Sequence, residues 1–410
     1  MAQKFIEQGY EIVKHTEKAD IYIINTCTVT NMSDRKSRQM LRRAKLLNKE
    51  AIVVAVGCYA QVAKNEIEKI PEIDLSLGND EKINIVQYVE KYLTEKTNQI
   101  KIKDVMQSKE FAEFGDVTYT EKTRAVIKVQ DGCDRFCSYC IIPYARGRVR
   151  SRKPEHIISE IEKIAEEGIK EVVITGIHIA SYGKDFKEEY KLIDLLEEIN
   201  KIEGIKRIRL GSIEPLLITK EFLDRLIKLE KICHHFHLSL QSGCNETLKR
   251  MNRRYNIQEF EQIVENIRKY YKDAILTTDI IVGFPGESKE EFNQTYEFLK
   301  KIKFYKMHIF KYSQRKGTKA AIMPNQIDGS IKEERSKKLL ELSDKNQKEY
   351  NMEYIGKEVE VLFEEKEEEF YKGHTKNYIE VKCKTNINMQ NEIKTVKCKI
   401  AKTDYIIAEI

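Results

Sequence analysis

Several common sequence features are missing from this chain of 410 residues. No apolar run approaches the roughly 18 residues that a membrane-spanning helix needs, and no secretory signal peptide is recognised. No Walker-type loop and no GxGxxG fingerprint occurs, so no mononucleotide or dinucleotide motif is recognised. The nine cysteines, an odd number, predict a cytoplasmic protein whose thiols are reduced or metal-bound. We expect no membrane partner.

Charge is abundant but nearly balanced. Charged residues make up 34% of the chain, whereas the net charge is only +6. This slight basic excess permits a nucleic-acid partner without requiring one. A chain of this length is expected to form two or three domains, each with its own core.

Three cysteines carry the strongest chemical signal. Cys133, Cys137 and Cys140 form a Cys-x3-Cys-x2-Cys motif directly after the apolar run 125–129. Three thiolates on one short loop can bind three irons of a [4Fe–4S] cube and leave the fourth iron open to a substrate or cofactor. A zinc site would need a fourth ligand at matching spacing, and a Cys137–Cys140 redox pair would leave Cys133 unused. We therefore predict a catalytic iron–sulfur cluster.

The pattern of apolar residues divides the chain into an N-terminal α/β domain (1–95), a linker (96–122), a central domain (123–348) and a C-terminal domain (349–410). The first domain alternates buried strands (20–26 and 51–56) with a basic helix from Ser33. The last has short alternating strands at 357–363, 378–384 and 395–400 with a turn at 372–373, which is typical of a small antiparallel barrel.

The central domain repeats a strand-then-helix unit. Strands are predicted at 125–129, 171–174, 205–210, 236–240, 277–282 and 307–310, with helical patterns such as 156–167 and 257–271 between them. Strands that alternate with helices form a parallel sheet or barrel. Because six strands are fewer than the eight of a closed barrel, we predict a partial (β/α)6 barrel.

Two further cysteines follow strands of the first domain. Cys27 comes after the strand 20–26, and Cys58 comes after the strand 51–56. Residues just past the carboxyl ends of parallel strands face one crevice, so the two thiols could bind one object. Each could equally be a small buried apolar side chain, which is the usual fate of a free cysteine.

Several motifs together resemble one enzyme family, the radical S-adenosylmethionine (AdoMet) methylthiotransferases. The cysteine motif, with an aromatic residue before its last cysteine, resembles the radical AdoMet signature. The resemblance spans nearly the whole chain and includes a C-terminal stretch similar to the small RNA-binding barrel called TRAM. Its motifs lie at 25–30, 56–61, 175–179, 211–215, 239–243, 281–287 and 372–378.

The resemblance implies two [4Fe–4S] clusters and AdoMet as cofactors. The cluster of Cys133, Cys137 and Cys140 would cleave AdoMet to a deoxyadenosyl radical, and a second cluster at Cys27 and Cys58 would supply or carry sulfur. Partners would be a tRNA anticodon stem-loop and an electron donor such as flavodoxin or ferredoxin. Five residues are expected to bind AdoMet, although the glycines among them suit ordinary tight turns almost equally well: Tyr139, Gly176, Glu214, Gln241 and Gly283.

The resemblance also implies which molecule is modified, and this chain departs from the family pattern at one point. The runs 137–152 and 235–245 most resemble the branch that modifies threonylcarbamoyladenosine in tRNA. The alternatives are isopentenyladenosine in tRNA and an aspartate of a ribosomal protein. The family has a further N-terminal cysteine as third ligand of the second cluster. We expect that ligand and its strand to lie upstream of Met1, which leaves that cluster incomplete in this chain.

Basic residues suggest where RNA could bind. Arg35, Arg38, Arg42 and Lys45 fall on one predicted helical face, with Met40, Ala44 and Leu47 available for the other. A solvated charged face explains this pattern equally well. The alternating arginines at 146, 148, 150 and 152 are expected to divide among AdoMet, substrate and fold, while the acidic run 364–369 is expected to be a solvated loop. His178, His237 and His308 are expected in core or supporting roles.

Overall fold

The computed structural model describes residues 1–97, 99–115 and 123–410, and the chain forms two compact units. The N-terminal unit contains the described residues of 1–118 together with residues 131–150 and 313–322. The core unit contains residues 123–130, 151–312 and 323–410. The cysteine loop after residue 131 therefore belongs, by its contacts, to the N-terminal unit.

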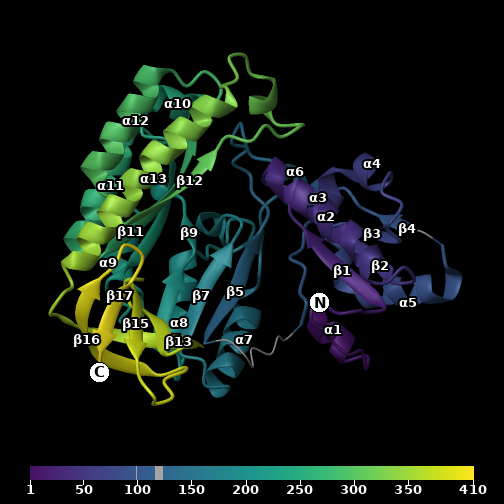
Figure 1. Cartoon of the computed structure of the whole chain (residues 1–410), viewed down its shortest axis with the longest axis horizontal. Coiled ribbons are helices and arrows are strands. Elements are labelled where there is room, and N and C mark those ends of the chain that lie inside the picture. The colour runs from purple at the N-terminus through teal and green to yellow at the C-terminus, as the bar shows by residue number, and fades with distance from the viewer. Residues whose placement is uncertain (98, 116–122) are drawn as a thin grey trace. The chain divides into compact units, whose positions relative to one another are not determined.

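The N-terminal unit is built on a parallel sheet in the order β1 (Ile21–Thr26), β2 (Ile52–Gly57), β3 (Leu75–Leu77) and β4 (Gln99–Lys101). Strand β2 is buried along its whole length because apolar clusters cover both faces of the sheet. Helices α2 (Asn31–Leu47), α3 (Cys58–Val62) and α5 (Ile85–Glu95) pack on this sheet (Figure 1). The other helical elements of the unit are α1 (Ala2–Ile6), α4 (Lys64–Ile67), α6 (Ile142–Arg146), η1 (Glu81–Asn84), η2 (Val105–Gln107) and η5 (Lys319–Ile322).

Part of the predicted linker is ordered as secondary structure. Residues 99–101 form β4 and pair with β3, and residues 105–107 form η2. The linker prediction is wrong at these residues because a short polar strand at a sheet edge carries little of the apolar pattern on which strand prediction depends. The rest of the predicted linker includes residues 98 and 116–122, which lie outside the described residues.

The core unit contains the six predicted parallel strands. They are β5 (Arg124–Asp131), β7 (Glu171–Gly176), β8 with β9 (Arg207–Leu210 and Ser212–Ile213), β10 (His235–Gln241), β11 (Ile275–Val282) and β12 (Lys306–Lys311). Hydrogen bonds join them as two four-stranded sheets, β6-β5-β7-β8 and β12-β11-β10-β9, where β6 is Arg150–Ser151. The break falls at Gly211, directly after the predicted strand 205–210, and the short strand β9 beyond it was not predicted. The prediction of a partial barrel agrees with this arrangement.

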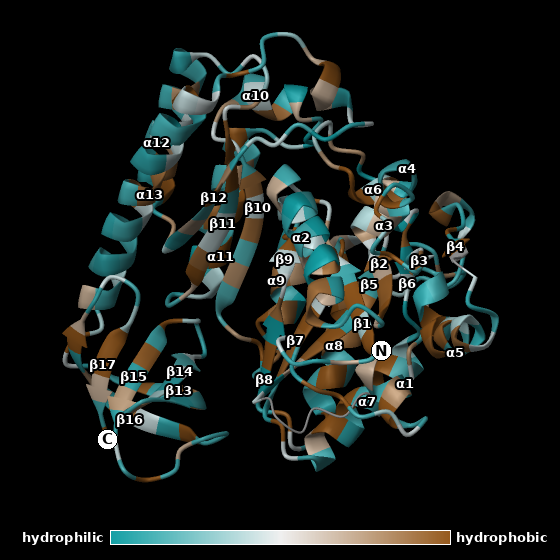
Figure 2. Cartoon of the chain, turned by 45° about the vertical axis from the view of Figure 1, so that its right-hand side comes forward, coloured by the Kyte–Doolittle hydropathy of each residue, from teal (hydrophilic) through white to brown (hydrophobic). Residues whose placement is uncertain are grey.

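Helices cover the core strands from outside and bury a large apolar cluster between them (Figure 1). Strands such as β10 and β11 are brown in Figure 2, whereas α12 and α13 are mostly teal. Capping boxes at Asn256 and Ser288 begin two of these helices. The elements are α7 (Pro154–Glu166), α8 (Leu192–Lys201), α9 (Lys220–Leu226), α10 (Asn245–Arg250), α11 (Ile257–Tyr270), α12 (Lys289–Ile302), α13 (Gly329–Met352), η3 (Ile179–Ser181) and η4 (Pro215–Leu217).

The C-terminal residues form a closed barrel in the order β13 (Glu358–Glu367), β14 (Phe370–Thr375), β15 (Glu380–Lys384), β17 (Ile406–Glu409) and β16 (Ile393–Ala401). Neighbouring strands are antiparallel except β15 and β17. The turn predicted at 372–373 is wrong, because both residues lie inside β14. Gly373 is required there by packing, since a Cβ would come within 2.2 Å of the Leu362 carbonyl oxygen. The acidic run 364–369 is not a free loop either, since its first four residues belong to β13.

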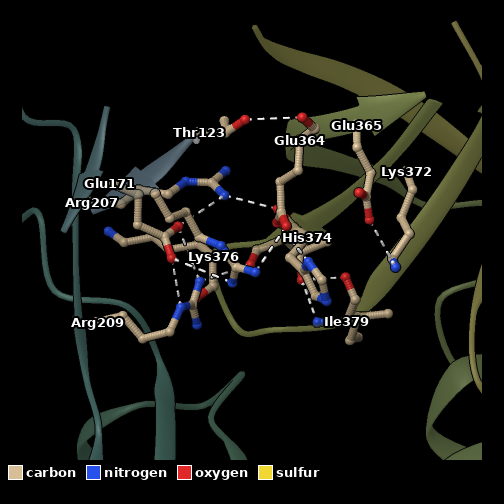
Figure 3. A network of polar contacts seen from close by, with 12 residues as sticks. Thr123, Glu171, Arg207, Arg209, Glu364, Glu365, Lys372, His374, Lys376 and Ile379 are labelled. Carbon is tan, nitrogen blue, oxygen red and sulfur yellow. Dashed lines mark hydrogen bonds and ion pairs between the residues drawn. The ribbon is translucent and has the colours of Figure 1, made fainter. Parts of the chain in front are cut away.

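A buried polar network joins this barrel to the core strands (Figure 3). The Glu171 carboxylate accepts two hydrogen bonds from Arg209, at 2.7 and 3.2 Å. Arg207 donates to the His374 carbonyl oxygen at 2.8 Å and to Glu360 at 2.9 Å. Tyr378 stacks between His235 and His374, with ring centroids 4.5 and 4.7 Å away.

His374 and Tyr378 belong to the segment 372–378, which resembles an RNA-binding barrel. In this structure the segment joins the barrel to the core strands. Among the residues that the structure describes, no helix has the length and apolar character to cross a membrane.

Candidate active site

The three-cysteine motif lies on a tight loop after β5. Gly132 begins the loop with φ of +73°, and a Cβ there would lie 1.7 Å from the Arg148 carbonyl oxygen. Only glycine fits such an approach. Backbone bonds from Cys133 to Gly147 (3.0 Å) and from Cys140 to Cys137 (2.9 Å) fold the loop back on itself. Sequence and packing thus bring all three cysteines into one short loop.

Aromatic side chains belong to the same loop. Phe136 adopts φ of +47° and packs edge-to-face on Tyr144 at 5.7 Å, while the Arg148 guanidinium lies 5.1 Å from its ring. Cys133 is buried, whereas Cys137, Cys140 and Tyr139 are half-buried. The outer part of the loop is therefore open enough to meet a ligand.

The donor set of this loop fits a [4Fe–4S] cluster with one open iron, because it offers three thiols and no fourth. Across the described residues, no group of three or more His, Cys, Asp or Glu side chains is arranged to hold a single metal ion. A single metal ion needs all of its ligands around one point, whereas the thiolates of a cube each bind a different iron. The absence of a single-ion site among the described residues therefore does not argue against a cluster.

Cys27 and Cys58 lie at the ends of neighbouring strands, as the parallel-sheet rule predicts. Thr26 and Gly57, the residues directly before them, are partners in the β1–β2 register. The Thr26 hydroxyl donates to the Val56 carbonyl at 2.6 Å and accepts from the Ala60 amide, which fixes both strand ends. Cys27 is exposed and Cys58 is buried.

The sulfur of Cys58 has two polar neighbours. Arg146, the last residue of α6, donates through Nε to Cys58 Sγ at 3.1 Å. The Asn79 amide lies 3.8 Å from the same sulfur and donates to the Ala145 carbonyl oxygen at 2.7 Å. Sequence reasoning missed Asn79, although it also follows the carboxyl end of a strand, β3, and the same rule would have found it.

A second polar clamp lies beside Cys27. Arg315 is 7% exposed and donates to Asp34 at 2.5 Å and to Thr28 at 2.7 Å. Within the same segment, the Ala320 amide donates to the Ser138 carbonyl oxygen at 2.7 Å. Residues 313–322 therefore link the loop after Cys27 to the three-cysteine loop. No local sequence pattern predicts this link, because Arg315 is more than 280 residues from Asp34 and Thr28, and Ala320 is more than 180 residues from Ser138.

In the core unit, the residues expected to bind AdoMet lie at or just after carboxyl ends of strands. Glu214 is buried and lies 3.2 Å from His178 Nε2. Gln241 ends β10 with φ of +72°. At Gly176, the end of β7, a Cβ would lie 2.9 Å from the Gln130 carbonyl oxygen. These placements fit a ligand crevice at the strand ends.

Gly283 follows β11 and neighbours a buried ion pair that sequence reasoning missed. Its amide donates to Glu287 at 3.2 Å, and Glu287 pairs with Arg335 at 2.5 Å. Burial raises the pKa of Glu287, and Arg335 only partly offsets this effect. A Cβ at Gly283 would lie 2.3 Å from the flexible Lys332 side chain, so glycine here is explained by the turn (φ +70°).

The predicted basic face of α2 is only partly correct. Arg35 and Arg42 are exposed, but Arg38 bonds the Tyr59 hydroxyl at 3.0 Å and Lys45 pairs with Asp74 at 2.9 Å. The opposite face is also partly wrong, since Met40 is 49% exposed. The helix buries Ala44 as predicted, together with Asp34, Ser37 and Leu41, because small and polar residues contribute to its inner face.

The arginines at 146–152 make different contacts within the protein, and their predicted contacts with AdoMet and substrate stay predictions. Arg148 is exposed and pairs with Asp134 at 3.2 Å. Arg150 is 2% exposed and lies 3.8 Å from Asp131, and Arg152 pairs with Glu160. His237 and His308 have ring centroids 5.6 Å apart, and His237 pairs with Asp279.

Comparison with known proteins identifies the family. Residues 127–299 match the Radical SAM superfamily, and residues 1–78 match the Uncharacterized protein family UPF0004. The chain is 42% identical to threonylcarbamoyladenosine tRNA methylthiotransferase MtaB of Bacillus subtilis, over 98% of this chain and 90% of that protein. The chain belongs to the radical AdoMet methylthiotransferases. The corresponding MtaB of Aquifex aeolicus is 44% identical, over 93% of this chain and 92% of that protein.

More distant relatives agree with this family. The tRNA-2-methylthio-N(6)-dimethylallyladenosine synthase of Caldicellulosiruptor saccharolyticus is 37% identical over 95% of this chain and 81% of that protein. Among solved structures, the radical AdoMet methyltransferase TsrM of Kitasatospora setae shares the fold with a TM-score of 0.57. It is 17% identical, with 78% of this chain and 68% of that chain covered. As a radical AdoMet enzyme, this methylthiotransferase requires AdoMet and a [4Fe–4S] cluster.

Proposed function

We propose that this methylthiotransferase converts N6-threonylcarbamoyladenosine in tRNA, next to the anticodon, into its 2-methylthio derivative. The observation that carries the proposal is the identity of 42–44% over nearly the whole chain to two enzymes named for that nucleoside. The dimethylallyladenosine synthases are less similar, at 37% identity and below. Isopentenyladenosine is therefore the alternative acceptor, followed by an aspartate of a ribosomal protein.

Cys133, Cys137 and Cys140 hold the radical cluster in this proposal. When bound, the cluster supplies one electron to AdoMet, which starts hydrogen removal at C2 of the acceptor adenine. The chain contributes a loop fixed by Gly132, which holds the thiols in place. Tyr139 and the strand-end residues Gly176, Glu214, Gln241 and Gly283 bind and orient AdoMet.

Cys27 and Cys58 supply two of the ligands of a second cluster that carries the sulfur. Their positions at register-paired strand ends support this assignment. A guanidinium 3.1 Å from the Cys58 sulfur also supports it, because a neighbouring cation stabilises a thiolate, the ligand form of cysteine.

The remaining assignments concern partners and domains. A tRNA anticodon stem-loop binds in part through exposed basic residues of α2, namely Arg35 and Arg42, and a flavodoxin or ferredoxin donates electrons in the cytoplasm. We retain residues 1–95, 123–348 and 349–410 as the methylthiotransferase, radical AdoMet and TRAM-like domains. The barrel's charge is nearly balanced, with ten lysines against eleven acidic residues in 357–410.

The test is an anaerobic assay of the reconstituted protein with dithionite, AdoMet and tRNA that contains the unmodified acceptor. The intact protein should form deoxyadenosine and the methylthio nucleoside. Cys58→Ala should form deoxyadenosine but no methylthio nucleoside. Equal methylthiolation by Cys58→Ala would refute the sulfur-carrying role, and methylthiolation of isopentenyladenosine alone would favour the alternative acceptor.

A further inference from the structure

A polar cavity of about 360 Å³ lies within the core unit. Part of its lining is a row of side chains from four adjacent parallel strands. Ser212 of β9 pairs in register with His237 of β10, His237 with Thr277 of β11, and Thr277 with Lys306 of β12. His308, two residues after Lys306, lines the same cavity. Because side chains alternate across a strand, these residues share one face of the sheet.

Packing alone does not explain the polar character of this face. Residues on the opposite face, such as Leu238 and Met307, belong to the large apolar cluster of the core unit. The inner face of a barrel sheet is filled by branched apolar side chains where it serves packing. Here His237 instead contacts the Thr277 hydroxyl at 2.9 Å and the Asp279 carboxylate at 3.2 Å. The row therefore suits a polar ligand.

Lys306 supplies an available positive charge to the cavity. The residue is half-buried, and no ion pair or side-chain hydrogen bond joins its ammonium group to another of the residues that the structure describes. Arg209 also lines the cavity, but its guanidinium already donates two hydrogen bonds to Glu171. Glu380 and Asp404 line the cavity from the C-terminal barrel without pairing with Lys306. An anionic group that enters the cavity can therefore pair with Lys306.

Toward the carboxyl ends of the strands, the same face becomes apolar. Phe310 is 48% exposed and pairs in register with Ile281. Ile281 lies two residues before Gly283, which is expected to bind AdoMet. An exposed aromatic ring can stack on an unstacked base. The face thus offers an apolar platform near the expected AdoMet site and polar groups farther from it, which matches an adenine ring with a polar substituent.

We propose that this cavity receives the N6 substituent of the acceptor adenosine and that Lys306 determines specificity by pairing with the threonylcarbamoyl carboxylate. This inference rests on the proposed function, because it takes threonylcarbamoyladenosine as the acceptor. The substituent also carries a hydroxyl and N–H groups, for which His308 and Asp279 provide hydrogen-bonding partners. An isopentenyl group offers none of these and would leave the polar lining unpaired, which is how a polar site rejects an apolar analogue.

The experiment measures the binding of anticodon stem-loop RNAs to the reconstituted full chain under anaerobic conditions. Four RNAs differ only at the acceptor, which is threonylcarbamoyladenosine, its neutral carboxamide analogue, isopentenyladenosine or unmodified adenosine. Dissociation constants come from fluorescence anisotropy at one fixed salt concentration. The parent is compared with Lys306→Met. The matched control is Lys311→Met, on the opposite face of the same strand, where Lys311 pairs with Glu333 at 2.5 Å.

The parent should bind the threonylcarbamoyl RNA more tightly than the other three. Lys306→Met should weaken binding of that RNA by about tenfold, because a hydrogen-bonded charge pair is lost. Lys306→Met should leave binding of the carboxamide and unmodified RNAs unchanged, and Lys311→Met should leave all four unchanged. Equal affinity of the parent and Lys306→Met for the threonylcarbamoyl RNA would overturn the inference. So would a loss in Lys306→Met that is the same for all four RNAs, which is the result of a structural role.

Methylthiolation of the same RNAs by the parent separates the two proposals. If the parent modifies the threonylcarbamoyl RNA while Lys306→Met binds it and modifies it equally well, the inference fails and the proposed function stands. If the parent modifies the isopentenyl RNA alone, the proposed function fails, and the assignment of Lys306 fails with it.

Discussion

The carboxylate of Glu171 should be the most costly single group to remove from the junction of barrel and core. It is 1% exposed and binds Arg209 through two hydrogen bonds, with Arg124 and Arg207 at 3.9 and 4.0 Å (Figure 3). Burial alone would raise the pKa of Glu171, but Arg209 and the other two guanidinium groups lower it further than burial raises it. Glu171→Gln leaves Arg207 and Arg209 buried with no carboxylate between them.

Removing one partner of a buried ion pair costs about 3–5 kcal/mol. For a unit of this size, that loss lowers the melting temperature by about 6–20 °C, at roughly 2–4 °C per kcal/mol. The assay is urea unfolding of the cluster-free protein followed by circular dichroism. The matched control is Glu360→Gln, since Glu360 also contacts Arg207 but is 57% exposed at its side chain, and we expect less than about 1 kcal/mol from it.

The same variant has a defined pH dependence. Because the pKa of Glu171 is lowered on folding, its contribution to stability is fully present above the ordinary value of 4.5 and is lost as the pH falls through the lower folded value. The difference in the free energy of unfolding between the parent and Glu171→Gln should be constant from about pH 5 to 7, where ordinary carboxylates are ionised. This difference should become smaller at more acidic pH. A loss below about 1 kcal/mol for Glu171→Gln, equal to that of Glu360→Gln, would refute the reasoning.

Three other changes test the cysteine loops. Cys137→Ala should abolish AdoMet cleavage, because two thiolates cannot hold three irons; continued deoxyadenosine formation, measured by liquid chromatography, would contradict the radical-cluster assignment. Gly132→Ala should reduce bound iron after reconstitution well below the parent level, because its Cβ meets the Arg148 carbonyl oxygen; normal iron content would show that the loop adapts. Arg315→Met should destabilise the N-terminal unit by about 3 kcal/mol in urea, because Asp34 is left buried without its partner; an unchanged unfolding midpoint would contradict this clamp.

Much of the fold was predictable because short apolar or alternating segments indicate strands. The six core strands and the strands before Cys27 and Cys58 were predicted from such segments, and the parallel-sheet rule then placed the two cysteines at adjacent strand ends. Failures occurred where tertiary packing overrides local pattern. Gly373 looked like a turn residue but lies inside β14, because a neighbouring strand approaches too closely for any side chain.

The polar contacts of the site could not be predicted in the same way. Arg146 and Cys58 are 88 residues apart, and Arg315 and Asp34 are 281 apart, so no local periodicity links them. An arginine also has the same sequence signature whether it is solvated or buried against a sulfur. The face of α2 was misjudged for a related reason, since apolar Met40 faces solvent while polar Ser37 is buried.

The central claim concerns the acceptor, and the most direct measurement is mass spectrometry of nucleosides from total tRNA. Cells that lack this gene are compared with the parent strain. The account predicts that the methylthio form of threonylcarbamoyladenosine disappears while its unmodified precursor accumulates. If that nucleoside is unchanged and isopentenyladenosine loses its methylthio group instead, the proposed acceptor is wrong; if neither changes, the tRNA substrate is contradicted.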